Sequence, residues 1–107
     1  MFISNKKVMI KFISKKTKYF LQQFYKIFSS KYQNKNYIII NNHLKCCGDG
    51  ALDPYNDGDE EARRLLASNL LNEYIHENFS DQRVILLGDL NDELTDRMLD
   101  NVFVPFI

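Results

Sequence analysis

Two short polar segments hold the residues of this sequence that are best suited to chemistry. His43 follows one apolar run, and Asp89 and Asn91 follow another after a glycine. A carboxylate can accept a proton from a water molecule or help to bind a hard cation, and a carboxamide can hold that water. An imidazole can donate to developing negative charge. His43, Asp89 and Asn91 are therefore the candidate catalytic residues, and Asp89 and Asn91 are the candidate metal ligands.

Each motif also has an ordinary structural interpretation. A lone histidine at a strand end is more often a satisfied structural residue, and Gly-Asp-x-Asn is a common turn sequence. Asn41, on the same strand as His43, is expected only to support it. The pairing of the two motifs, with a helix between them, is what favours a function.

Two strands are predicted to position these residues. Residues 36–44 are rich in β-branched residues and contain an unbroken apolar run, which is typical of a strand covered on both faces. Residues 24–28 are the predicted antiparallel partner, with the polar stretch 29–35 as the turn. Residues 83–87 form a second strand of the buried type, which ends at Gly88.

A helix is predicted between these two strands. Asp57 or Asp59 can serve as its N-cap, and acidic residues then lie at the positive end of the helix dipole. The helix is expected to end near Asn78. Its apolar side is predicted to contain Leu66, Ala67, Leu70, Leu71, Tyr74 and Ile75. Leu65 is the only large apolar residue off this side, and His76 is expected on the polar side.

A strand, a helix and a strand in this order form a βαβ unit with parallel strands and a right-handed crossover. Both strands end at the same edge of the sheet, which is where ligand sites of open α/β sheets lie. We therefore expect His43 close to Asp89, and expect Asn91 to point the same way as Asp89 from an extended segment. The predicted fold class is α/β (α+β), with a β-hairpin plus one βαβ unit.

These motifs, in this order, resemble the endonuclease/exonuclease/phosphatase superfamily, which has the DNase I-like fold. The resemblance covers about residues 24–107 and rests on Asn-Asn-His-Leu-Lys at 41–45, Glu-Glu-Ala-Arg-Arg at 60–64 and the segment 84–92. It implies part of an αββα sandwich and hydrolysis of phosphodiesters or phosphomonoesters with Mg²⁺ or Mn²⁺. The resemblance does not identify the substrate, which could be DNA, RNA, a lipid or inositol phosphate, or a small ester.

The resemblance also implies a role for each candidate residue. His43 would contact the scissile phosphate, and Asp89 would orient or deprotonate the attacking water and could contact the metal. Asn91 would hold that water and a phosphate oxygen, and could also contact the metal.

The sequence departs from the family pattern at two places. Residues 1–36 contain no Asp or Glu that could match the family's metal-binding Glu, and no late Asp-His pair is present. The chain also ends on an apolar segment, 102–107, although terminal residues are usually exposed. We therefore expect a fragment of such an enzyme that hydrolyses little by itself, because cooperating groups are missing.

Composition separates residues 1–23, which are basic, from the proposed domain at 24–107. The chain has 107 residues and a net charge of zero, but all ten lysines precede all fourteen acids. Lysines interleave with aromatic residues over 1–35, and positions 20, 24, 27 and 28 could line a helix face. Such a segment could bind nucleic acid or an anionic membrane surface, which gives the alternative of a small non-catalytic α/β module. A compositional accident of an A·T-rich reading frame is the favoured interpretation.

Other features exclude or narrow further classes. No apolar run is long enough to span a bilayer, and no convincing signal peptide is present. The adjacent Cys46 and Cys47 are expected to be free thiols, unless one pairs outside the chain. The acidic loop 49–59 suggests Ca²⁺, but the EF-hand pattern fails at Tyr55 and Arg64. A loop that caps its helix is the favoured interpretation.

Overall fold

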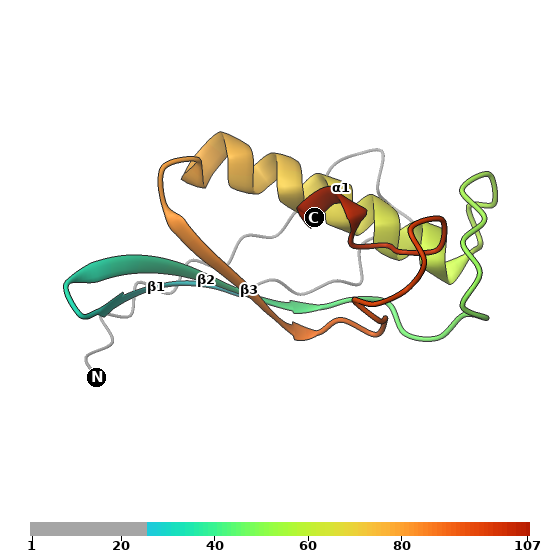
Figure 1. Ribbon diagram of the computed structural model, residues 1–107, viewed down its shortest axis with the longest axis horizontal. Coiled ribbons are helices and arrows are strands. Elements are labelled where there is room, and N and C mark those ends of the chain that lie inside the picture. Colours follow the sequence, from blue (N-terminus) through green and yellow to red (C-terminus); the bar gives the residue numbers. More distant parts are fainter. Residues whose placement is uncertain (1–25) are drawn as a thin grey trace.

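Two strands, a helix and a third strand follow one another along residues 26–107, the part of the chain that this computed structural model describes (Figure 1). The elements are β1 (Lys26–Tyr32), β2 (Lys35–His43), α1 (Glu60–Phe79), β3 (Arg83–Asp89) and the 3₁₀ helix η2 (Val104–Phe106). The predicted mixed α/β class is confirmed. The basic segment 1–23, its proposed ligands and the domain boundary beside it lie outside the described residues.

Strands β1 and β2 form the predicted hairpin, but with a shorter turn. They pair antiparallel from Lys26↔Asn41 to Tyr32↔Lys35. Gln33 and Asn34 alone form the turn, with φ of 46° and 61°, as the twist-matched two-residue turn requires. The predicted turn over 29–35 was wrong because β1 has only one strand neighbour among the described residues, so its polar residues can pair and still reach water.

The alternative prediction of a helix face through positions 20, 24, 27 and 28 is wrong at positions 27 and 28. Ile27 and Phe28 lie in β1, opposite Ile40 and Ile39 of β2. An extended backbone places these two side chains on opposite faces of the sheet, so they cannot share one helix face. Positions 20 and 24 lie outside the described residues.

Strands β2 and β3 pair in parallel, and the strand order is β1-β2-β3. The predicted βαβ unit is therefore confirmed. Strand β3 continues beyond its predicted end to Asp89, because Gly88 remains in the strand with φ of 131°. A Cβ atom at Gly88 would collide with the backbone of Asn42, so glycine allows β2 and β3 to approach closely at this point.

Helix α1 begins as predicted, after the second of the two candidate caps. The Asp59 side chain accepts a hydrogen bond from the backbone N–H of Ala62 at 2.7 Å, and Glu60 and Glu61 occupy the first turn. The carboxylates thus lie where the helix dipole stabilises them. The helix ends at Phe79, one residue after the predicted end, and lies along one face of the sheet (Figure 1).

Two apolar clusters hold the helix in place. The first joins the sheet to α1 through Ile27, Ile38, Ile40 and Leu71, with Tyr74, Ile75, Phe79, Val84 and Leu86 partly buried around them. The second contains Leu44, Ala67, Val102 and Phe103, with Leu65 and Leu90 beside them. Leu65, predicted to lie off the apolar side, is packed because the segment after β3 returns across the helix (Figure 1).

The sheet face opposite α1 is apolar and less covered. Alternation along the strands places Phe28, Ile39, Ile85 and Leu87 on this face. Ile85 and Leu87 are each 42% exposed, whereas Ile38 and Ile40 on the helix side are buried. Within residues 26–107, the prediction of a strand covered on both faces therefore holds only on the helix side. No helix of this region has both the length and the apolar composition needed to cross a membrane.

Candidate functional site

The parallel pairing of β2 and β3 brings His43 opposite Asp89 at the last position of each strand. His43 Nε2 lies 3.7 Å from Asp89 Oδ2, and the two side chains are 63% and 64% exposed. The predicted proximity is confirmed. The separation exceeds that of a hydrogen bond, and both side chains are exposed, so each group can bond to a third molecule placed above them.

Asn42 fixes the strand ends just before this pair. Its side chain is buried on the helix side, and Nδ2 donates to the backbone oxygens of Ile40 and Leu87, at 3.3 Å each. The amide thus ties β2 to β3 one register position before His43 and Asp89. Asn41 is exposed and lies on the same face as His43 by alternation, which leaves its supporting role a prediction.

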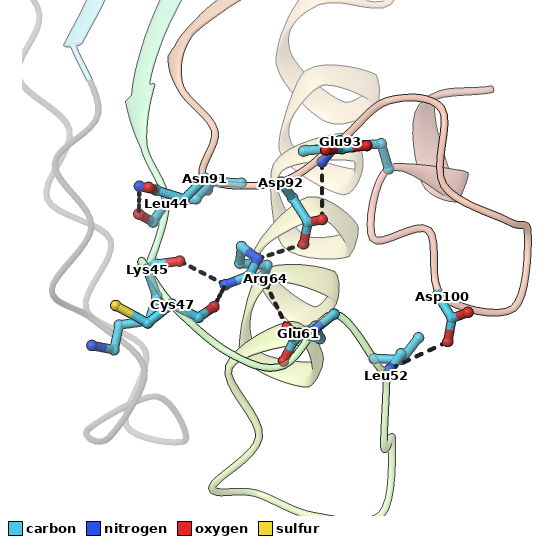
Figure 2. Close-up of polar contacts among 12 residues, drawn as sticks. Leu44, Lys45, Cys47, Leu52, Glu61, Arg64, Asn91, Asp92, Glu93 and Asp100 are labelled. Carbon is cyan, nitrogen blue, oxygen red and sulfur yellow. Dashed lines mark hydrogen bonds and ion pairs between the residues drawn. The ribbon is translucent and has the colours of Figure 1, made fainter.

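Asn91 reaches the same edge by a different route from the one predicted. The strand ends at Asp89, and Asn91 has φ of 50°, so the expected extended segment from Asp89 to Asn91 is wrong. Asparagine tolerates this left-handed conformation because its short side chain can hydrogen-bond locally. Its Nδ2 donates to the backbone oxygen of Leu44 at 2.9 Å (Figure 2). Leu44 N–H donates in turn to the Asp89 backbone oxygen at 2.9 Å, so the two strand ends are joined twice.

Beneath this edge lies a buried arginine that sequence reasoning did not single out. Arg64 of α1 is 2% exposed. Its Nε donates to Asp92 Oδ2 at 2.7 Å, and its Nη1 donates to the backbone oxygens of Lys45 at 2.9 Å and Cys47 at 2.7 Å. Its Nη2 lies 3.1 Å from Glu61 Oε1 (Figure 2).

One guanidinium therefore joins three segments: the loop after β2, the first turns of α1 and the loop after β3. The planar fork of arginine has five donors, which suits it to this position better than a lysine ammonium. One sequence signal was the spacing of Glu61 and Arg64, which are neighbours on a helix surface. A second was that Arg64 precedes Ala67 and Leu71 by three and seven residues, which places it on the predicted apolar side of the helix.

A second group of carboxylates lies at the start of the helix. Asp49, Asp59 and Glu61 place one ligand oxygen each within 4.8 Å of one another and could hold a metal ion. Within residues 26–107 this is the one such group of three or more histidine, cysteine and acidic side chains. It does not include Asp89 or Asn91, the predicted metal ligands. The predicted helix-capping role of the loop is confirmed by Asp59.

Other titratable groups surround these sites. Cys46 and Cys47 are exposed free thiols, as predicted, and a hydrogen bond with Cys46 raises the pKa of Cys47. Thiolate formation at Cys47 is thereby disfavoured. In the loop after β3, desolvation and a hydrogen bond with Asp92 raise the pKa of Asp96. The predicted solvated position of His76 is confirmed, because that residue is exposed on α1.

Comparisons of the chain with protein-family models, with curated proteins and with solved structures find no match. The functional interpretation therefore depends on the site geometry and on the motifs themselves.

Proposed function

We propose that the edge formed by His43, Asp89 and Asn91 is part of a divalent-metal-dependent phosphoesterase centre of the endonuclease/exonuclease/phosphatase type. Its substrates would be phosphodiesters or phosphomonoesters. The observation that carries this proposal is the approach of His43 Nε2 to Asp89 Oδ2, at 3.7 Å on an exposed edge. Segments far apart in the sequence deliver a donor and a base to one place, with Asn91 held beside them through Leu44.

The three side chains divide the work of phosphate-ester hydrolysis. Asp89 is the one carboxylate of the trio and is therefore the group that accepts the proton of an attacking water. His43 Nε2 donates to a phosphate oxygen as negative charge develops there. Because the Asn91 amide nitrogen is bonded to Leu44, its Oδ1 is the atom left to position the water. Water and phosphate would lie over the exposed side of this pair, where both His43 and Asp89 face solvent.

The proposed metal is Mg²⁺ or Mn²⁺, which would neutralise charge on the phosphoryl group. Asp89 and Asn91 fit such an ion, since their donors are hard oxygens and Mg²⁺ typically takes one or two carboxylates plus waters and substrate phosphate. Asp92 is less suited, because its Oδ2 is bonded to the buried Arg64. Asp89 is then the main protein carboxylate for the ion among the described residues.

The open sheet face supports the DNase I-like part of the proposal. In an αββα sandwich, each sheet carries helices on one face and packs against a second sheet on the other. Here α1 covers one face, and Phe28, Ile39, Ile85 and Leu87 make the other face apolar. A contiguous apolar face of this kind is typical of a surface that another element covers.

The test uses the fact that the chain contains only two histidines. Imidazole NMR signals of His43 and His76 can be followed separately while inorganic phosphate is added with and without Mg²⁺. We expect phosphate with Mg²⁺ to shift the His43 signal and leave His76 unchanged. Asp89→Asn should remove the Mg²⁺ dependence of the shift, because the carboxylate that holds the ion is lost.

A matched control is Asp81→Asn, which changes an exposed acid before the opposite end of β3. This variant should behave as the unchanged chain does. Equal shifts of both histidines, or a Mg²⁺ dependence that survives in Asp89→Asn, would refute the proposed site.

A further inference from the structure

We propose that Asp49, Asp59 and Glu61 bind one hard divalent cation, Ca²⁺, where the acidic loop joins the start of α1. Their ligand oxygens already lie within 4.8 Å of one another. The site is distinct from the His43–Asp89 edge, and it does not depend on the proposed hydrolase function.

The first support is an unpartnered oxygen of Glu61. This side chain is 2% exposed, and its Oε1 accepts from Gly50 N–H at 2.8 Å and pairs with Arg64 Nη2 at 3.1 Å. Its buried Oε2 has no hydrogen-bond partner among residues 26–107. Leaving a buried carboxylate oxygen unsatisfied is costly, and a bound cation removes that cost.

The second support is that backbone N–H groups also fix the other two carboxylates, each through only one of its two oxygens. Asp49 Oδ1 accepts from Ala51 N–H at 2.9 Å. Asp59 Oδ2 accepts from Ala62 N–H at 2.7 Å and from Asp53 N–H at 3.3 Å. These bonds do not use the second oxygen of either carboxylate. The three side chains are therefore fixed in orientation before an ion arrives, which lowers the entropy cost of binding.

Gly48 closes the loop over this group. Its φ is 112°, and a Cβ atom here would collide with the Glu61 carboxylate. The backbone at 48–50 thus passes directly over Glu61, while Asp49 at the loop surface remains exposed. An ion can reach the group from the Asp49 side and contact Glu61 beneath the loop.

The ligand chemistry favours Ca²⁺ over other ions. All three ligands are carboxylates, which select hard cations. Oxygens on opposite sides of Ca²⁺ are about 5 Å apart, whereas those on Mg²⁺ are about 4 Å apart. Oxygens within 4.8 Å of one another therefore need to move less to share one Ca²⁺ than to share one Mg²⁺. The charge of the group also favours a bound cation. Arg64 is the cation paired with Glu61, but it is shared with Asp92 and so does not neutralise the three carboxylates.

The test titrates CaCl₂ into the metal-stripped full chain by calorimetry and measures thermal unfolding at each concentration. We expect one Ca²⁺ per chain, a higher Tm with Ca²⁺, and weaker binding of Mg²⁺. Asp49→Asn should weaken Ca²⁺ binding at least tenfold, because it removes a ligand charge while keeping the oxygen that accepts from Ala51 N–H.

The matched control is Asp53→Asn. Asp53 is exposed in the same loop, and its Oδ1 accepts a hydrogen bond from Tyr55 N–H at 3.1 Å. This bond matches the one that Asp49 Oδ1 accepts from Ala51 N–H. This variant should bind Ca²⁺ as the unchanged chain does. Asp89→Asn should also retain full Ca²⁺ affinity, which separates this site from the proposed catalytic edge. Absence of Ca²⁺ binding, equal losses in the Asp49 and Asp53 variants, or loss in Asp89→Asn would overturn the proposal.

Discussion

At the scale of single residues, Arg64 does more to organise the candidate site than the candidate catalytic residues do. His43 and Asp89 are exposed at the strand ends, whereas Arg64 is buried and holds the loops that follow both strands. Its charge is compensated by Glu61 and Asp92, which are 2% and 8% exposed. A buried ion network of this kind is sensitive to the loss of one member, because the remaining charges stay buried.

Replacing Arg64 by alanine should therefore destabilise the fold by about 3–5 kcal/mol, since Glu61 is left buried without its cation. Arg64→Lys should be intermediate, because a point charge cannot reproduce the fork of donors. Urea denaturation followed by circular dichroism measures both effects.

The control for this prediction is Arg97→Ala. Arg97 also pairs with an acid three residues away in the chain, since its Nη2 lies 2.8 Å from Asp100 Oδ2. The Arg97 side chain, however, is 87% exposed. Exposed pairs contribute less than about 1 kcal/mol. If the Arg64 and Arg97 variants lost similar stability, the central role of the buried network would be wrong.

At the scale of elements, the sequence predicted those features that depend on residues close together in the chain. The β-branched run of β2 and the Asp59 cap were readable because strand preference and capping depend on neighbouring residues. Parallel pairing of β2 and β3 followed from the order of the elements, and it brought His43 to Asp89.

The features that were missed depend on contacts between distant segments. Leu65 is packed because the segment after β3 returns over α1, and no helix period can show that. Asn91 is turned into the left-handed region, with its amide bonded to Leu44 at the end of the other strand. Arg64 can be buried with its charge because the loops after β2 and β3 supply its acceptors. In each case the contacts that were missed join segments many residues apart, and local sequence spacing does not show such contacts.

The close approach of β2 and β3 yields a prediction about Gly88. A Cβ at this position would meet the Asn42 backbone, and φ is 131°. Gly88→Ala should therefore lower the free energy of unfolding by more than the backbone strain alone, which is about 1–2 kcal/mol. Chemical denaturation gives the change, and the His43 NMR signal reports whether the strand end has moved.

Gly50→Ala separates strain from collision. Gly50 also has a positive φ, 82°, but no heavy atom lies within 4 Å of the Cβ it would gain. This variant should lose only the strain contribution and leave the His43 signal in place. An equal loss of stability in the two variants would mean that Asn42 can move aside and that the strand contact is not tight.

At the scale of the whole molecule, the described residues form one sheet with a helix on one side and an apolar face on the other. The proposed catalytic edge lies where that apolar face ends, since His43 and Asp89 continue the alternation of Ile39 and Leu87. A second layer packed on this face would border the edge and could add groups to it. The proposed αββα sandwich thus explains both the apolar face and the small number of acids at the site.

Hydrolysis by the chain alone should accordingly be slow. Asp89 is the main carboxylate available to a metal at this edge in the described region, and residues 1–36 contain no acid at all. Poor neutralisation of the phosphoryl charge raises the barrier, and loss of cooperating groups leaves little activity. Assays with bis-p-nitrophenyl phosphate and plasmid DNA, in Mg²⁺ or Mn²⁺, should show rates close to those of Asp89→Ala. Rapid turnover that Asp89→Ala abolishes would contradict this expectation, because Asp89, His43 and Asn91 would then suffice with whatever the rest of the chain supplies.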